Sequence, residues 1–248
     1  MAVTLSRIVD SGYFLVPPEL LGVAPGMNKF EGAMCFEIDD ESLVEVSIKS
    51  YAAELIRLPF PVCWFEFSKE PYRVGVLAIE SRGAIEWNCF FRKGASDPVE
   101  KHWRFGGRIS ELMVVNDGRS LQFCYQGLRS EWTYPFIRFV MDVCVSFLSL
   151  LHCANVARVE HFPSEKLMRA RAKRGKKPLF SYWTLQLDMS NSECAAELGG
   201  THASPRIHLR RGHVARRKEG PNAGKWWWVS ACVVRGSGHG MVHKDYRA

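Results

Sequence analysis

Two histidines and one arginine near the C-terminal end have the residue types and spacing that acid–base chemistry on a phosphodiester requires. The segment around them predicts a strand, on which His208 and Arg210 share one face. A bulge at Gly212 would bring His213 to the same face. One imidazole could then accept the proton of a ribose 2′-hydroxyl, the other could protonate the leaving oxygen, and the guanidinium would stabilise the charged transition state. His208, Arg210 and His213 are therefore candidate catalytic residues of a metal-independent ribonuclease.

The same strand also suits a binding role without catalysis, and this is the interpretation we favour. The histidines would then only donate hydrogen bonds to phosphate oxygens. Further arginines along the segment would add phosphate contacts. The candidate nucleic-acid-binding residues here are Arg206, Arg211, Arg216 and Arg217.

Residues 165–177 form a second basic segment, which the sequence predicts to be a helix. Ser164 can cap its first turn, and Gly175 can end it. Its apolar content is too small to anchor it by burial, and close cations repel one another unless an anion neutralises them. Salt-dependent binding to phosphates is one interpretation; a solvated helix and a contact with an acidic protein are the alternatives. The candidate binding residues are Lys166, Arg169, Arg171, Lys173, Arg174, Lys176 and Lys177.

Three consecutive tryptophans follow Lys225. On a strand, alternation would send Trp227 to the face opposite Trp226 and Trp228. An indole that lies exposed beside cations can stack on the bases of single-stranded nucleic acid, and Trp227 is the candidate for this role. A buried strand with tryptophan on both faces is the alternative.

The positive charge of the chain is confined to its C-terminal part. The 248 residues carry a net charge of +7, but residues 1–157 hold 15 Lys and Arg against 19 Asp and Glu, whereas residues 158–248 hold 18 against 7. A regional excess of cations is typical of proteins that bind a polyanion. Segments 165–177 and 206–217 hold 12 of those 18 cations. A nucleic-acid-binding function therefore predicts that the two segments share one surface.

Cysteine usage and the N-terminal residues predict a protein of the cell interior. The eight cysteines stand singly, mostly in apolar runs, as is typical of free buried thiols in a reducing compartment. The first residues lack the pattern of a signal peptide. Disulfides in a secreted protein are the alternative. The histidines, with Cys194 and Cys232, match no structural zinc spacing, and no phosphate-binding glycine motif is present, so we expect neither a metal nor a cofactor.

The pattern of apolar residues predicts an α+β fold, with a mainly antiparallel sheet covered by a long buried helix. An amphipathic helix is expected over about 43–57. Turn residues separate the expected strands, and the pairs Gly106-Gly107 and Asp117-Gly118 are among them. Strands are expected at 62–67, 73–79, 84–91, 109–115, 121–125, 156–162 and 180–187.

The expected helix at 134–153 is almost long and apolar enough to span a membrane. Arg138, Asp142, Ser146 and Ser149 interrupt it at helical spacing and form one narrow polar stripe, on which the first two can pair. A core helix that shows this thin edge to water is therefore favoured over a membrane span.

The change of composition near residue 155 suggests two regions. Residues 1–155 would form an acidic α+β scaffold, and residues 156–248 a basic, His- and Trp-rich, β-rich region. One continuous domain is the alternative. The oligomeric state is not predicted.

Three stretches, 58–67, 163–179 and 204–213, resemble a group of phage and prophage proteins of unassigned chemistry. The resemblance implies a mobile-element context, such as host takeover, anti-defence or a toxin-like nuclease, and it assigns no catalytic residue. The main hypothesis is a protein that binds RNA or single-stranded DNA, with ribonuclease activity as an open question. The alternative is a non-enzymatic inhibitor that binds a host protein complex, and an enzyme for an anionic small molecule is a third option.

Overall fold

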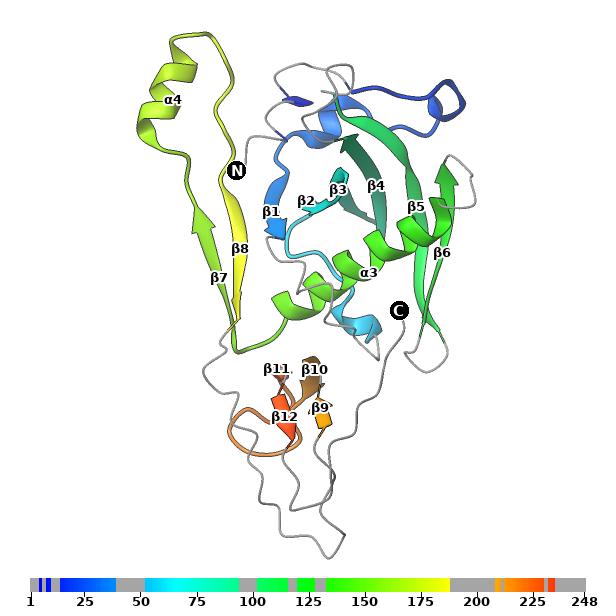
Figure 1. Ribbon diagram of the computed structural model, residues 1–248, viewed down its shortest axis with the longest axis vertical. Helices are drawn as coiled ribbons and strands as arrows, with labels where there is room; N and C mark the ends of the chain where they lie inside the picture. The colour runs from blue at the N-terminus through cyan, green and yellow to red at the C-terminus, as the bar shows by residue number, and fades with distance from the viewer. Residues whose placement is uncertain are drawn as a thin grey trace, which may run out of the picture.

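The computed structural model describes residues 5, 8–9, 14–38, 52–93, 102–115, 120–127, 133–187, 208–210, 212–229 and 232–234, with only the backbone for 208–210 and 232–234. Its first part contains three short 3-10 helices and six strands (Figure 1). These are η1 (Pro18–Leu20), η2 (Met27–Phe30), η3 (Ala53–Leu55), β1 (Met34–Ile38), β2 (Val62–Lys69), β3 (Tyr72–Ser81), β4 (Ala84–Lys93), β5 (Arg104–Val115) and β6 (Ser120–Gly127).

The remaining described elements are two α-helices and six strands. They are α3 (Thr133–Leu151), β7 (Val156–His161), α4 (Glu165–Ala172), β8 (Tyr182–Leu187), β9 (His208–Arg210), β10 (His213–Arg216), β11 (Trp226–Val229) and β12 (Cys232–Val234). The α+β class is therefore confirmed.

One mixed sheet of eight strands forms the body of the protein, in the order β6-β5-β4-β3-β2-β1-β8-β7. Neighbouring strands are antiparallel except that β1 pairs in parallel with both β2 and β8. The sequence analysis predicts no strand at β1. The sheet also continues across residue 155, because β7 and β8 complete one end of it.

The strands expected from alternation are present, with one difference at Gly106-Gly107. This pair lies inside β5 and does not form the expected turn. The reason is packing, because a Cβ atom on Gly106 would lie 2.1 Å from the ring of Phe91. Strands β5 and β6 form the expected hairpin, with Val115 opposite Ser120, and its Asp117-Gly118 turn lies outside the described residues.

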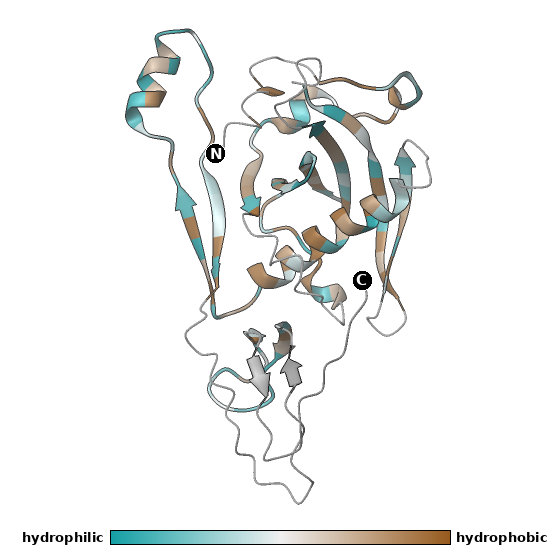
Figure 2. Ribbon diagram, viewed as in Figure 1, coloured by the Kyte–Doolittle hydropathy of each residue, from teal (hydrophilic) through white to brown (hydrophobic). Residues whose placement is uncertain are grey.

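Alternation along the strands gives the sheet two apolar faces. On β2, for example, Phe65 faces α3, and Trp64 faces the N-terminal segment. The helix lies across the first face, and most of its surface is apolar (Figure 2). On the second face Phe30 packs against Trp64 and Phe90. Both faces of the sheet are therefore buried in the centre.

Helix α3 is the expected core helix, but its polar stripe is only partly at the surface. Arg138 pairs with Asp142, with 3.2 Å between Nε and Oδ1, and both are partly exposed. Ser146 and Ser149 are buried, so the prediction that the whole stripe faces water is wrong. The backbone explains this, since the hydroxyl of Ser149 donates to the carbonyl of Val145 at 2.8 Å and needs no water. The helix is long and apolar enough to cross a membrane, yet 67% of its apolar window is buried inside the protein, as in the core helix of a soluble protein.

The end of the helix expected over 43–57 is not α-helical. The described residues contain the single turn η3, and residues 56 and 57 are not helical. Residues 43–51 lie outside the described residues.

The C-terminal strands form two small sheets, β10 with β11 and β9 with β12. The prediction of one bulged strand over 206–217 is therefore wrong. Gly212 lies between the strands, where a Cβ atom would be 2.5 Å from the ring of Trp228. Asn155 attaches β11 to the body, because its side-chain amide exchanges hydrogen bonds of 2.9 and 2.8 Å with the backbone of Trp228.

Candidate nucleic-acid interface

Residues 162–181 form an arm between β7 and β8, with α4 at its end (Figure 1). The two strands belong to the sheet, and the arm extends beyond them. At its root His161 stacks on Tyr182, with 4.7 Å between the ring centroids, and its Nε2 lies 2.8 Å from Oγ1 of Thr184. These contacts fix the point at which the arm leaves the sheet.

The cap predicted for the arm helix is confirmed. Oγ of Ser164 accepts a hydrogen bond from the backbone N–H of Leu167 at 3.4 Å. The helix ends at Ala172, earlier than predicted, so that Lys173–Lys177 form a turn. Gly175 makes this turn possible with a φ of +64°. The guanidinium of Arg171 closes it with two hydrogen bonds to the carbonyl of Lys177, at 3.1 and 2.9 Å.

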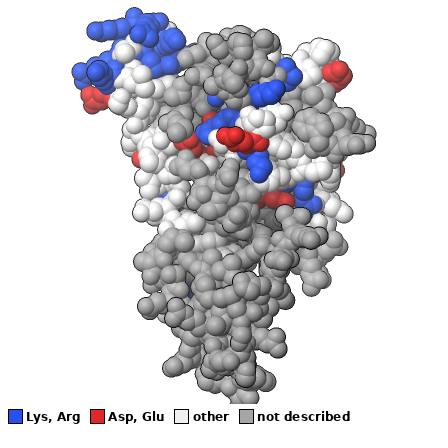
Figure 3. Space-filling model, viewed as in Figure 1, with Lys and Arg blue, Asp and Glu red and all other residues white. Residues whose placement is uncertain are grey.

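The arm is positively charged and open to solvent. No residue of α4 is buried, and Figure 3 shows Lys and Arg gathered over its end. Glu165 pairs with Arg169 at 2.8 Å, but both side chains are about four-fifths exposed, so the pair contributes little to stability. Arg171 shapes the turn. The other five cations form no ion pair with a described carboxylate; they are Lys166, Lys173, Arg174, Lys176 and Lys177.

Three of the arm's cations line one shallow depression on α4. It is bordered by Lys166, Arg169 and Lys173, which follow one another at three and four residues and therefore share a helix face, and also by Glu165, the ion-pair partner of Arg169. A phosphate group in this depression would be reached by several cations at once. The helix thus presents its charge in an arrangement that suits an extended polyanion.

An exposed aromatic side chain on the arm was missed by sequence reasoning. Phe162 is 73% exposed. The sequence places it last in a strand over 156–162, whereas β7 ends at His161. The following Pro163 could have predicted the earlier end of the strand, because proline commonly ends strand pairing.

On β11, the expected alternation of the tryptophans is confirmed. Trp228 is buried in the main core and Trp226 packs against it, while Trp227 lies on the other face under the guanidinium of Arg217, 4.5 Å from its ring centroid. Arg216 is held by the protein itself, since its Nε donates to the carbonyl of Gly224 at 2.9 Å.

The predicted catalytic group is described only in part. His213 is half-buried on β10, and His208 and Arg210 belong to β9, in the other small sheet. The side chains of His208 and Arg210, together with Arg206 and Arg211, lie outside the described residues. Catalysis by these residues stays a prediction.

The two basic segments do not share one surface. Helix α4 lies at one end of the long axis, and β10 and β11 lie toward the other (Figure 1). The register explains the separation, because β11 is attached at Asn155, just before β7 begins, while the arm starts where β7 ends. Six strand residues span about 20 Å. The expectation of one joint surface is wrong, so a nucleic-acid site built from both segments together is excluded and the arm by itself remains the candidate interface.

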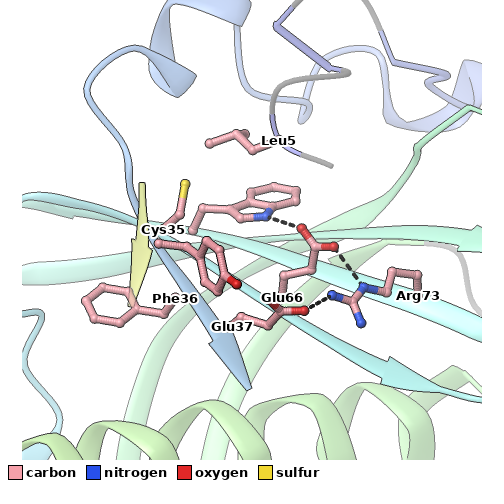
Figure 4. Close-up of a pocket in the computed structure, with 8 residues that line it drawn as sticks. Leu5, Cys35, Phe36, Glu37, Glu66 and Arg73 are labelled. Atoms are coloured by element: carbon pink, nitrogen blue, oxygen red, sulfur yellow. Dashed lines mark hydrogen bonds and ion pairs between the residues drawn. The ribbon is translucent and has the colours of Figure 1, made fainter. Parts of the chain in front are cut away.

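A polar cluster lies buried on the sheet face opposite α3, at the joined strands β1, β2 and β3 (Figure 4). Nη2 of Arg73 donates to Glu37 and Nε donates to Glu66, both at 2.8 Å. Nη1 of the same guanidinium donates to Oγ of Ser68 at 2.7 Å, and the indole of Trp64 donates to Glu66 at 3.0 Å. The carboxylates are thus occupied by structural contacts.

Protonation in this cluster also favours a structural role. Burial by itself lowers the pKa of Arg73, but Glu66 and Glu37 outweigh it and raise that pKa, so the guanidinium stays charged. Burial raises the pKa of the Cys35 thiol, which lines the same small cavity, to about 12. That thiol is therefore protonated at neutral pH and is a poor nucleophile.

Among the residues that the structure describes, no three His, Cys, Asp or Glu side chains are grouped so that they could hold a metal ion. Comparisons with protein-family models, with curated proteins and with solved structures found no match for this chain. The resemblance to phage proteins stays a prediction, and function is inferred from the geometry and charge of the arm.

Proposed function

We propose that the arm, residues 162–181, binds nucleic acid through the phosphate backbone. The observation that carries the proposal is the exposure of six cations against one carboxylate on α4 and its following turn. Arg171 and Ser164 hold the turn and the helix without help from a ligand, so the cations are in place before binding. Phosphate contacts of this kind release counterions and give salt-dependent, sequence-tolerant affinity.

In this proposal the basic, β-rich C-terminal region adds a second and separate contact. Arg217 and Trp227 form a cation–π pair on β10 and β11 at some distance from the arm. A long strand of RNA or single-stranded DNA in the host cytoplasm could reach both, while a short one would use the arm alone. A ribonuclease step through His208, Arg210 and His213 is a separate hypothesis.

Removing four cations from the turn should weaken binding. The variant K173A/R174A/K176A/K177A leaves Ser164, Arg171 and the backbone carbonyl of Lys177 in place, so the arm keeps its shape. Since each lost phosphate contact removes favourable counterion release, affinity for a 20-nucleotide single strand should fall more than about ten-fold near 0.1 M salt. Fluorescence anisotropy with a labelled strand measures this.

A matched control removes four exposed cations from the body of the protein, at Lys29, Lys69, Lys93 and Arg104. It should bind within about two-fold of the wild type. Equal losses in the two variants would mean that only net charge matters, and the arm would lose its assignment. The competing proposal, an inhibitor of a host protein complex, instead expects a stoichiometric protein partner from nuclease-treated host lysate.

A further inference from the structure

The arm has a small apolar contact of its own, between Met168 and Leu179, and Phe162 lies outside it. Leu179 is buried, and its backbone N–H lies 3.4 Å from the sulfur of Met168, so the returning chain packs on α4 there. Phe162 is 73% exposed instead. Its phenyl ring therefore contributes little to the folding of the arm.

The backbone on both sides of Phe162 is fixed. His161 before it is held by Thr184 and Tyr182, and Pro163 after it restricts the chain. Ser164 then caps α4. The ring is thus presented from a restrained segment, which lowers the conformational entropy that the arm would lose on binding a ligand.

A ligand for this place needs negative charge for the cations and a flat apolar face for the ring. Nucleic acid whose bases are unpaired has both, because each base can stack on an aromatic side chain while the phosphates meet Lys and Arg. In a duplex the base faces are covered by their neighbours. An anionic membrane would be the other candidate, but α4 lacks the broad apolar face of an interfacial helix, with only Leu167 exposed among its large apolar residues.

We infer that Phe162 is a base-stacking platform and that the arm selects single-stranded over double-stranded nucleic acid. This inference rests on the proposed function of the arm. It assigns the discrimination between the two forms to one side chain, separate from the cations that supply affinity.

Three substitutions at Phe162 test the inference, and its exposure makes each of them compatible with folding. F162A should weaken binding to a 12-nucleotide oligothymidine about 5- to 100-fold, the range that base–aromatic stacking covers. F162L keeps the apolar bulk without an aromatic face and should lose as much as F162A. F162W should bind as well as the wild type or better. A 12-base-pair duplex should be bound equally, within about two-fold, by all four proteins.

The outcomes separate this inference from the proposed function. If K173A/R174A/K176A/K177A weakens binding but F162A does not, the arm binds phosphates and the stacking role is wrong. If neither variant weakens binding, the proposed function fails. Tight binding to phosphatidylserine vesicles that F162L retains and F162A loses would assign the ring to a membrane and overturn the inference.

Discussion

Replacing Arg73 with methionine is expected to lower the free energy of unfolding by about 3–5 kcal/mol. The reason is that Glu37 and Glu66 are 7% and 5% exposed and share this guanidinium as their cationic partner in the described structure. Methionine fills similar space but removes the guanidinium that pairs with both buried carboxylates. Urea denaturation followed by circular dichroism measures the change.

The matched control is Arg108→Met, on the same face of the sheet. Arg108 pairs with Glu86 at 3.0 Å, but the two side chains are 28% and 37% exposed, so solvent screens the pair and the loss should be about 1 kcal/mol or less. Adding Glu37→Gln and Glu66→Gln to R73M should recover part of the stability. Equal losses for R73M and R108M would contradict the role of the buried cluster.

Replacing Trp228 with alanine is expected to cost about 3–5 kcal/mol of stability as well, because it leaves a cavity in the main core. Trp228 is 4% exposed, and its ring fills the space above Gly212. The loss should be largest at β10 and β11, because this side chain packs them against the main core. Hydrogen exchange of residues 212–229 should therefore accelerate more than that of the eight-stranded sheet.

Trp227 provides the comparison for this prediction. It is next in sequence but half-buried on the opposite face, under Arg217. Trp227→Ala should leave the exchange of the β10–β11 hairpin nearly unchanged and should cost much less stability. Similar exchange rates in W227A and W228A would show that the hairpin is not held by the core contact.

Local patterns predicted much of the sheet and its helix. The strands from β2 to β8 and the buried α3 follow from alternation and apolar periodicity, which depend on neighbouring residues. Strand β1 was missed because its two parallel pairings join residues distant in sequence. The cluster of Glu37, Glu66 and Arg73 was missed for the same reason, since only the register of three strands brings them together.

The residue types of the candidate site were predicted from the sequence, but their arrangement in space was not. The cations of 165–177 are exposed, and Ser164 caps their helix as expected. The early end of α4 depends on Arg171 folding back to Lys177, which spacing alone does not show. The distance from the arm to β10 and β11 depends on where Asn155 holds Trp228, which is a tertiary contact.

If the arm binds the phosphates of single-stranded nucleic acid, the affinity of the protein must fall steeply as the salt concentration rises. The dissociation constant of the intact protein for an oligothymidine is measured from low to physiological salt. With about 0.7 counterions released per phosphate contact and about five or six arm cations engaged, a log–log slope of about 3.5 to 4 is predicted, falling by about 3 in K173A/R174A/K176A/K177A. Undetectable binding at low salt, or the same slope in both proteins, would contradict the account.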